Sequence, residues 1–310
     1  LRKWDGQMRR HRLRRDIIAT VVANDMIHRC GPSFPSRLMP AAGADAQAFT
    51  AGYEAAKAVL EIPALWESVE ALDGKIPAGG QMVLFRRLSA ALRGATFWLA
   101  RRAARERLEV DGLVSRYGAD FKALRRLLPG ILSPIEQGSV EARVRDLIAA
   151  GAPEDKARAV AILQPLTTAG DLVDIAEAST WPLASVARLY HAIGAAFGFD
   201  RVRQAASAYS VGDNFERTAL RRLIEDLLTQ QAELTRTVMA FTGGAQAGDD
   251  AEAAKDAANS WAALHREKAG AARRTIDDIE ASGGPWTFAK LTIANAALRE
   301  LAAEGPKRKR

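Results

Sequence analysis

The sequence predicts an all-α protein, a bundle or array of roughly ten to twelve helices with no β-sheet. Apolar residues recur at steps of three and four along nearly the whole chain, which is the spacing of one helix face. Aromatic residues make up only 6% of the 310 residues. Small and unbranched apolar residues must therefore fill the core, and these favour helix packing over sheets. No run alternates apolar and polar residues as a half-buried strand does.

Capping and turn residues divide the chain into helices. A stripe of apolar residues within 14–29 predicts a first helix that ends at Gly31 and Pro32. Pro35 and Pro40 predict an extended loop after it. Aspartate, threonine and proline start signals then place the later helices. We expect these over 45–60, 64–72, 77–108, 113–117, 120–128, 135–149, from 153, and over 171–178, 180–198, 200–210, 213–241, 249–281 and 286–303, with Asp45, Thr180 and Asp200 as caps.

The clearest periodicity lies in residues 213–241. Six apolar residues there follow steps of 4, 3, 7, 4 and 3, a heptad seam in which polar Gln231 fills the missing position. The seam is either ordinary core or the docking face of an independent interaction module that recruits a partner helix. Coverage of the seam by other helices of this chain distinguishes the two. Its members are Leu220, Ile224, Leu227, Leu234, Val238 and Phe241.

Glycines after the seam suggest how the chain is divided. We expect a main helical body over residues 1–242 and a terminal helical pair with a basic tail over 243–310. The stretch 245–255 is a candidate flexible linker between them. The two parts can also pack on one body as a single domain.

We expect no catalytic, cofactor-binding or metal-ligating residues in this chain. An NAD site needs a strand, a glycine turn and a helix start, and the glycine pairs at 79–80, 243–244 and 283–284 follow no predicted strand. A phosphate loop of the GK[ST] type is absent. Glu225–Asp226, Asp249–Asp250 and Asp277–Asp278 are expected on solvated helix faces or in first turns.

Asp25, His28 and Cys30 come nearest to a chemical cluster. Asp25 and His28 can share a helix face, and Cys30 points elsewhere. The four histidines, at positions 11, 28, 191 and 265, are scattered, so a metal site is not expected. Because His28 faces a different side from Cys30, an activated thiol is not expected either.

The net charge of +7 is carried mostly by arginine, which supplies 34 of the 44 basic residues. Arginines are dense at 9–15 and 101–107, and the chain ends in KRKR. Nucleic-acid binding would favour aromatic interleaving or a known module, so we expect solvated or carboxylate-paired faces. Nucleic-acid binding through the arginine-rich start is kept as a third hypothesis.

Cysteine usage and the termini bear on where the protein resides. The single cysteine excludes an internal disulfide and fits a reducing compartment. We expect no signal peptide and no membrane span. The first residue is Leu1 rather than methionine, so a processed or excised piece is expected.

Several segments resemble the C-terminal part of the large bacterial NAD-specific glutamate dehydrogenases. They are RRDIIATVVANDMIHRCGPSFPSRL (14–38), LWESVEALDGKIP (65–77), ALRGATFWLAR (91–101) and the run over 171–227, which passes through DIAEASTWPL and ends in NFERTALRRLIEDL. The likeness covers about residues 11–228 well and the remainder loosely. Gly74 and Phe215 stand where asparagine and tryptophan are expected, and both look compatible with the same turn and the same buried contact.

The resemblance implies a function for the longer protein. That family oxidises L-glutamate to 2-oxoglutarate and ammonium with NAD, an oxidoreductase reaction of amino acid catabolism. Its catalytic lysine and Rossmann domain lie upstream, so no catalytic or cofactor residue carries over to this chain.

For the fragment itself, the resemblance implies a non-catalytic structural or regulatory helical domain with no cofactor of its own, in the bacterial cytoplasm. Expected partners are the catalytic domain of the same chain and other subunits of a homo-oligomer, with no nucleic acid and no membrane. The alternative is a stand-alone helical protein-interaction scaffold.

Overall fold

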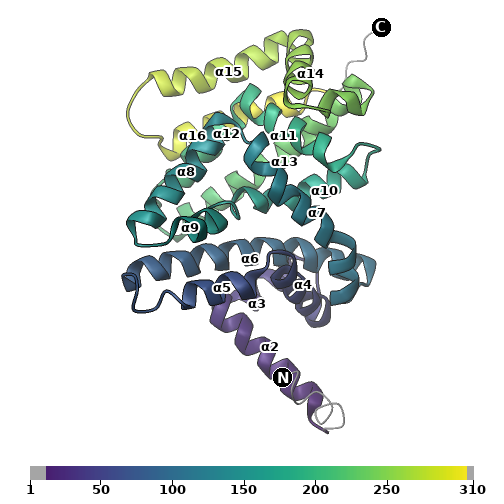
Figure 1. Cartoon of the computed structure of the whole chain (residues 1–310). Coiled ribbons are helices and arrows are strands. Elements are labelled where there is room, and N and C mark those ends of the chain that lie inside the picture. The colour runs from purple at the N-terminus through teal and green to yellow at the C-terminus, as the bar shows by residue number, and fades with distance from the viewer. Residues whose placement is uncertain (1–11, 306–310) are drawn as a thin grey trace. The chain divides into compact units, whose positions relative to one another are not determined.

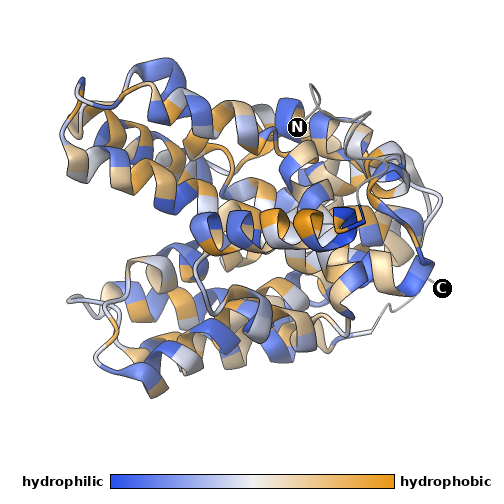
Figure 2. Cartoon of the chain, turned by 90° about the horizontal axis from the view of Figure 1, so that it is seen from below, coloured by the Kyte–Doolittle hydropathy of each residue, from blue (hydrophilic) through white to orange (hydrophobic). Residues whose placement is uncertain are grey.

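A computed structural model describes residues 12–305, apart from the side chains of residues 245 and 246. This part of the chain forms helices and turns without a strand, so the all-α prediction is confirmed for it (Figure 1). The helices carry hydrophobic and hydrophilic residues together, as the sequence spacing predicts (Figure 2). The chain divides into two compact units, and the three boundaries fall within α7, α8 and the short helix η2. The predicted basic residues at 9–10 and 307–310 lie outside the described residues.

The first unit contains residues up to 122 and residues 144–167. In it, α4 packs closely against α6, because a Cβ at Gly52 would overlap the backbone nitrogen of Ala100. Leu84, Leu88 and Leu92 on α6 are fully buried. Its helices are α2 (Arg14–Cys30), α3 (Phe34–Ala41), α4 (Ala46–Val59), α5 (Ile62–Glu70), α6 (Ala78–Glu106), the first part of α7 (Val110–Ile131), the last part of α8 (Pro134–Ala149) and α9 (Glu154–Ala161).

The second unit contains residues 123–143 and 168–310. Helix α11 is its core, because it contacts α10, α12, α13, α14 and η3. Its elements are the remaining parts of α7 and α8, α10 (Ala169–Glu177), α11 (Leu183–Phe197), α12 (Phe199–Ala208), α13 (Asn214–Thr242), η3 (Ala245–Gly248), α14 (Ala251–Leu264), α15 (Arg266–Ala281) and α16 (Phe288–Ala302). The short η2 (Pro165–Thr168) lies at the boundary.

Several predicted helix ends are confirmed. The carboxylate of Asp45 accepts a hydrogen bond from the backbone nitrogen of Ala48 at 2.8 Å and so caps α4. Gly31 ends α2 and Gly151 follows α8, with φ of +89° and +97°. Gly74 has φ of +69°, a conformation that asparagine adopts more readily than most residues. The expected exchange with asparagine therefore fits this turn.

The loop expected at Pro35 and Pro40 is instead the short helix α3. Pro35 lies in its first turn, where a backbone N–H has no partner within the helix. Pro40 lies in the last turn and removes only the bond to the Ser36 carbonyl. A helix of eight residues tolerates both, so the prediction of an extended loop was wrong.

Two predicted helix boundaries are misplaced. Residues 113–117 and 120–128 belong to one continuous helix, α7, which runs through Gly118. The predicted helix 249–281 is divided at His265, whose φ of −106° and ψ of 35° end α14. The His265 ring stacks on Trp261, with centroids 4.2 Å apart. His265 Nδ1 also lies 3.5 Å from a carboxylate oxygen of Glu304, a residue that is distant in the sequence.

Two predicted caps are also wrong. Thr180 does not cap α11, because Pro182 occupies the N-cap position. Asp200 does not cap α12, because Gly198 holds that position and Asp200 lies inside the first turn. Asp200 is only 3% exposed, so its carboxylate is directed to partners inside the unit.

The candidate linker 245–255 packs against the second unit. Residues 245–248 form η3, and the Gly248 carbonyl accepts a hydrogen bond from Arg188 on α11 at 3.1 Å. A Cβ at Gly248 would overlap the carbonyl oxygen of Ser185. Farther on, α14 contacts α11 and α13, and α16 contacts α13. The domain division at residue 243 stays a prediction.

The heptad seam of α13 is largely covered by other helices of the unit. Leu227, Leu234 and Val238 are completely buried, and so is Gln231. Leu220, Ile224 and Phe241 are half-buried. The buried middle of the seam favours ordinary core, and because the ends are not fully covered, the partner-recruiting seam stays a hypothesis.

One stretch, Glu154–Glu177, is long and apolar enough to cross a membrane by composition, with a mean hydropathy of 1.2 in its most apolar window. No such window was expected from the sequence. The stretch is not one uninterrupted helix, because it runs through α9, η2 and α10. Since 56% of the window is buried inside the protein, the stretch resembles core segments and is weak evidence for a membrane span.

We predict that Gly52→Ala destabilises the protein. The new methyl group would overlap the Ala100 backbone, which cannot move as a flexible side chain would. Overpacking of this kind costs about 1–3 kcal/mol. Denaturant unfolding followed by circular dichroism measures the change.

Gly94→Ala on α6 is the matched control, because its methyl group would meet only the Thr167 side chain at an ordinary 3.7 Å. Alanine in a helix interior is favoured over glycine by about 0.5–1 kcal/mol, so this variant should gain stability. Equal effects of the two substitutions would contradict the close approach of α4 and α6.

Candidate functional site

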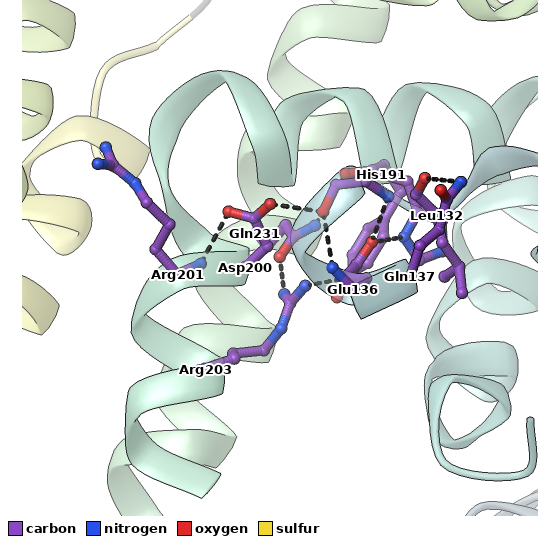
Figure 3. A network of polar contacts seen from close by, with 10 residues as sticks. Leu132, Glu136, Gln137, His191, Asp200, Arg201, Arg203 and Gln231 are labelled. Atoms are coloured by element: carbon purple, nitrogen blue, oxygen red, sulfur yellow. Dashed lines mark hydrogen bonds and ion pairs between the residues drawn. The ribbon is translucent and has the colours of Figure 1, made fainter. Parts of the chain in front are cut away.

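A buried polar cluster in the second unit joins α8, α11, α12 and α13 (Figure 3). We call it the Glu136 network and define it as Ser133, Glu136, His191, Asp200, Arg203 and Gln231. The side chains of four members, at 133, 191, 200 and 231, are at most 5% exposed. Buried polar groups are stable only when hydrogen-bonded, so the bonds of this cluster constrain the helices that carry them.

The network begins at the start of α8 with a capping box. The backbone nitrogen of Glu136 donates to the Ser133 hydroxyl at 3.2 Å, and the Ser133 nitrogen donates to Glu136 Oε2 at 3.0 Å. The sequence Ser-Pro-Ile-Glu at 133–136 has the serine and glutamate spacing of this motif. That local signal was available in the sequence and was missed.

Glu136 also holds two basic side chains from other helices. Its Oε2 lies 2.8 Å from His191 Nδ1 on α11, and its Oε1 accepts from Arg203 on α12 at 2.8 Å. Burial alone would raise the pKa of this carboxyl, but the hydrogen bond and electrostatic interaction with His191, and the charge of Arg203, lower its pKa to about 2. Glu136 is therefore a carboxylate at neutral pH.

Arg203 extends the network to α13. Its guanidinium donates to the Gln231 carbonyl oxygen, and the Gln231 amide donates to the backbone carbonyl of Tyr190 at 2.8 Å. A Cβ at Gly194 would lie 2.8 Å from the Gln231 amide nitrogen, so glycine at this position gives the amide its room. Gln231, the polar residue that interrupts the heptad seam, thus has specific hydrogen-bond partners in Arg203 and Tyr190.

Asp200 occupies the other side of Ser133. Its carboxylate accepts from the Ser133 hydroxyl at 2.6 Å and from the Arg201 backbone nitrogen at 2.8 Å. Burial raises the pKa of this carboxyl, and the nearby Glu136 charge acts in the same direction. The two neighbouring carboxyls therefore have pKa values displaced in opposite directions.

The geometry favours cohesion between helices over catalysis. His191 is oriented by Glu136 as a general base would be, but the Ser133 hydroxyl donates to Asp200 rather than to His191. His191 Nε2 is buried and has no hydrogen-bond partner within residues 12–305. An acid–base group must reach the proton that it transfers, and His191 is only 2% exposed.

The cluster expected around Asp25 is organised differently. The Asp25 carboxylate accepts hydrogen bonds from Arg29, Tyr53 and Lys57, each at 2.8 Å. The His28 ring packs against Trp66, with centroids 5.8 Å apart. Asp25 therefore links α2 to α4 through hydrogen bonds.

Cys30 is partly buried, and burial raises the pKa of its thiol to about 12. It is therefore protonated at neutral pH, which disfavours nucleophilic or metal-binding chemistry. Among the described residues, no group of three or more His, Cys, Asp or Glu side chains is placed to hold a metal ion.

The paired carboxylates act as caps and surface ion-pair partners. Asp250 caps α14 by accepting from the backbone nitrogens of Glu252 and Ala253. Asp277 pairs with Arg201 at 2.7 Å, and Asp226 pairs with Arg299 at 2.8 Å. These contacts agree with the structural interpretation of the pairs.

The arginines at 101–107 are partly internal. Arg102 is 5% exposed, donates to Glu106 at 2.8 Å and lies over the Trp98 ring at 4.9 Å. Arg105 also pairs with Glu106, at 3.2 Å. This run therefore includes carboxylate-paired side chains, as expected.

Lowering the pH should destabilise the folded protein, because Glu136 becomes protonated. Its pKa is about 2 in the folded protein against an ordinary value of 4.5, so its contribution is present above pH 4.5 and is lost as the pH falls towards 2. The contribution is on the order of 2–4 kcal/mol. Urea unfolding from pH 6 to pH 3 should show Glu136→Gln losing less stability than the parent protein.

Asp200→Asn tests the sign of this effect. Because the folded pKa of Asp200 is raised, its protonation favours the folded state as the pH falls. Replacing Asp200 by asparagine should therefore make the free energy of unfolding fall more steeply as the pH is lowered. Identical pH profiles for the parent protein and both variants would contradict the opposed pKa shifts.

The Cys30 thiol should react slowly with an aromatic disulfide reagent at pH 8. A pKa of about 12 against an ordinary 9.0 leaves about a thousandfold less thiolate. Absorbance of the released thiolate gives the rate, and the unfolded protein is the control. Equal rates for the folded and unfolded protein would rule out the burial of this thiol.

Comparison with known proteins places the chain in a family. A family model described as "Glutamate dehydrogenase, C-terminal" matches residues 1–300. The NAD-specific glutamate dehydrogenase of Halomonas elongata is 29% identical over 97% of this chain, and that of Pseudomonas aeruginosa is 28% identical over 97%. The NAD-specific glutamate dehydrogenase of Mycobacterium tuberculosis is 26% identical over 96% of the chain.

The chain spans 18% of the length of each of these relatives. They are bacterial proteins, which agrees with the bacterial family that the sequence resembles. The exposed position of Phe215, at 87%, shows that the buried contact expected for it was wrong. Because the family model covers nearly the whole chain, this protein belongs to the glutamate dehydrogenase C-terminal family.

Proposed function

We propose that this chain is the non-catalytic, helical C-terminal region of a longer NAD-specific glutamate dehydrogenase. The longer protein would oxidise L-glutamate to 2-oxoglutarate and ammonium with NAD. The observation that carries the proposal is the coverage: 97% of this chain aligns with only 18% of the Halomonas relative. A region of this extent is one part of a larger enzyme.

The helical architecture supports NAD binding elsewhere in the longer protein. Dinucleotide-binding folds hold the pyrophosphate at a glycine turn between a parallel strand and a helix. Residues 12–305 are built from helices and turns. The glycines at 243 and 283–284 follow α13 and α15 and have positive φ, as residues that end helices do.

The Glu136 network supports a structural role for the second unit. A carboxylate paired with His191 and Arg203 fixes α8, α11 and α12 relative to one another. Buried ion pairs contribute more to the uniqueness of packing than to net stability in some proteins. A domain with defined packing can hold or bias the conformation of the catalytic part to which it is joined.

The proposal includes partners and location. The partners are the catalytic domain of the same polypeptide and other subunits of a homo-oligomer, and neither nucleic acid nor a membrane is a partner. The location is the bacterial cytoplasm, where NAD-linked amino acid catabolism takes place. The partly buried thiol of Cys30 fits a reducing compartment.

The chain alone should neither bind NAD nor reduce it with glutamate. Calorimetric titration with NAD should show no binding at millimolar NAD, and absorbance at the NADH wavelength should not rise with glutamate present. The longer protein, expressed from the complete reading frame, is the positive control. Micromolar NAD binding by the chain alone would overturn the proposed division of labour.

A further inference from the structure

Helix α15 is held to the second unit by little apolar surface. Only three of its 16 residues are buried, against six of 15 in α16 and nine of 15 in α11. Two of these three, Ala269 and Ala272, have the smallest side chain after glycine, and the third is Ile276. Figure 1 shows α15 at the margin of the second unit, joined to α16 by a loop. Hydrophobic burial therefore stabilises this helix only weakly.

The charges of α15 also oppose its own helix dipole. Basic residues lie in its first turn and acidic residues in its last two turns. These are Arg266 and Lys268 at the start, and Asp277, Asp278 and Glu280 at the end. Because a helix favours carboxylates near its N-terminus and bases near its C-terminus, only Glu267 in the first turn stands at the favourable end. Gly270 inside the helix weakens it further.

Polar contacts from α11 and α12 supply what α15 lacks. The Arg273 guanidinium donates to the backbone carbonyl of Ala196, near the end of α11, at 2.7 Å. Arg201 on α12 pairs with Asp277 at 2.7 Å and with Glu280 at 2.9 Å. Arg201 thereby places a positive charge beside the C-terminal turns of α15, whose own last turn has no basic residue. The helix is therefore stabilised by docking more than by its own sequence.

The backbone at both ends of α15 departs from helical geometry. At the start, His265 separates α15 from α14 with φ of −106° and ψ of 35°. At the end, Gly283 and Gly284 have φ of +69° and +68°, and an added Cβ at either would meet no atom within 4 Å. Residues at the ends of elements absorb the backbone changes of a hinge. The chain can therefore change direction on either side of α15.

We propose that α15 is a strap that opens locally: it detaches from the ends of α11 and α12 and unravels, while α14 and α16 stay packed. Helix α14 contacts α11 and α13, and α16 contacts α12 and α13, so each has support that does not include α15. Opening uncovers the Ala196 carbonyl and the Gly198 backbone, against which the Ile276 side chain packs. The inference concerns the second unit and does not rest on the proposed function.

Hydrogen–deuterium exchange of the full chain, followed by mass spectrometry of peptides from single helices, tests the strap. Interior backbone amides of α15 should exchange at least tenfold faster than those of α14 and α16, because local opening requires less free energy than unfolding of the whole unit. Equal protection of the three helices would overturn the inference.

Arg201→Ala removes both ion pairs from α15 and should accelerate its exchange several-fold, with the exchange of α13 and α16 unchanged. Arg299→Ala is the matched control, because Arg299 on α16 pairs with Asp226 on α13 at 2.8 Å and has no contact with α15 among the ion pairs of the described residues. That variant should leave α15 unchanged. No change in α15 with Arg201→Ala, or an equal acceleration of every helix, would contradict local opening.

Gly270→Ala should act in the opposite direction. The nearest atom to its new methyl group would be a terminal nitrogen of the flexible Arg274 side chain, at 3.1 Å, and alanine favours the helix over glycine. Exchange of α15 should slow about two- to fivefold, without a change in α14 or α16. Unchanged or faster exchange of α15 in this variant would also overturn the inference, since damage to the fold cannot produce slower exchange.

Discussion

A carboxylate that is removed from water needs hydrogen-bond partners. Glu136 has one in the cap of its own helix and two on other helices. Its own capping box supplies the Ser133 nitrogen, α11 supplies His191 and α12 supplies Arg203. Arg203 in turn holds Gln231 on α13. Apolar packing alone tolerates sliding between helices, whereas these bonds require one register. The arrangement of the second unit depends on this constraint.

The first unit reaches its packing by a different route. The backbones of α4 and α6 approach closely because Gly52 has no side chain to separate them. The hydrogen bonds that Tyr53 and Lys57 on α4 donate to Asp25 then hold the second half of α2. Cohesion is thus strongest where backbones or buried charges meet and weakest along the first half of α2, because the single buried residue of this helix, Met26, lies in its second half.

The sequence was sufficient for the fold class and for many helix ends, because helical spacing and caps such as Asp45 are local properties. It misplaced the break at His265, whose Nδ1 lies 3.5 Å from the carboxylate of Glu304, a neighbour that local spacing does not reveal. His191 and Arg203 lie 55 and 67 residues from Glu136, so local spacing could reveal the capping role of Glu136 but not these two partners. The absence of a recognisable catalytic motif stays a prediction.

The glycine at position 248 bears on how this chain can be divided for study. Composition suggests that the segment between α13 and α14 is a convenient place to cut, tag or insert. Since Gly248 is seated on the Ser185 carbonyl and accepts a hydrogen bond from Arg188, even one added side chain there would lift η3 from α11. A cut at this point would therefore remove the contacts between η3 and α11 and expose the part of α11 that η3 covers.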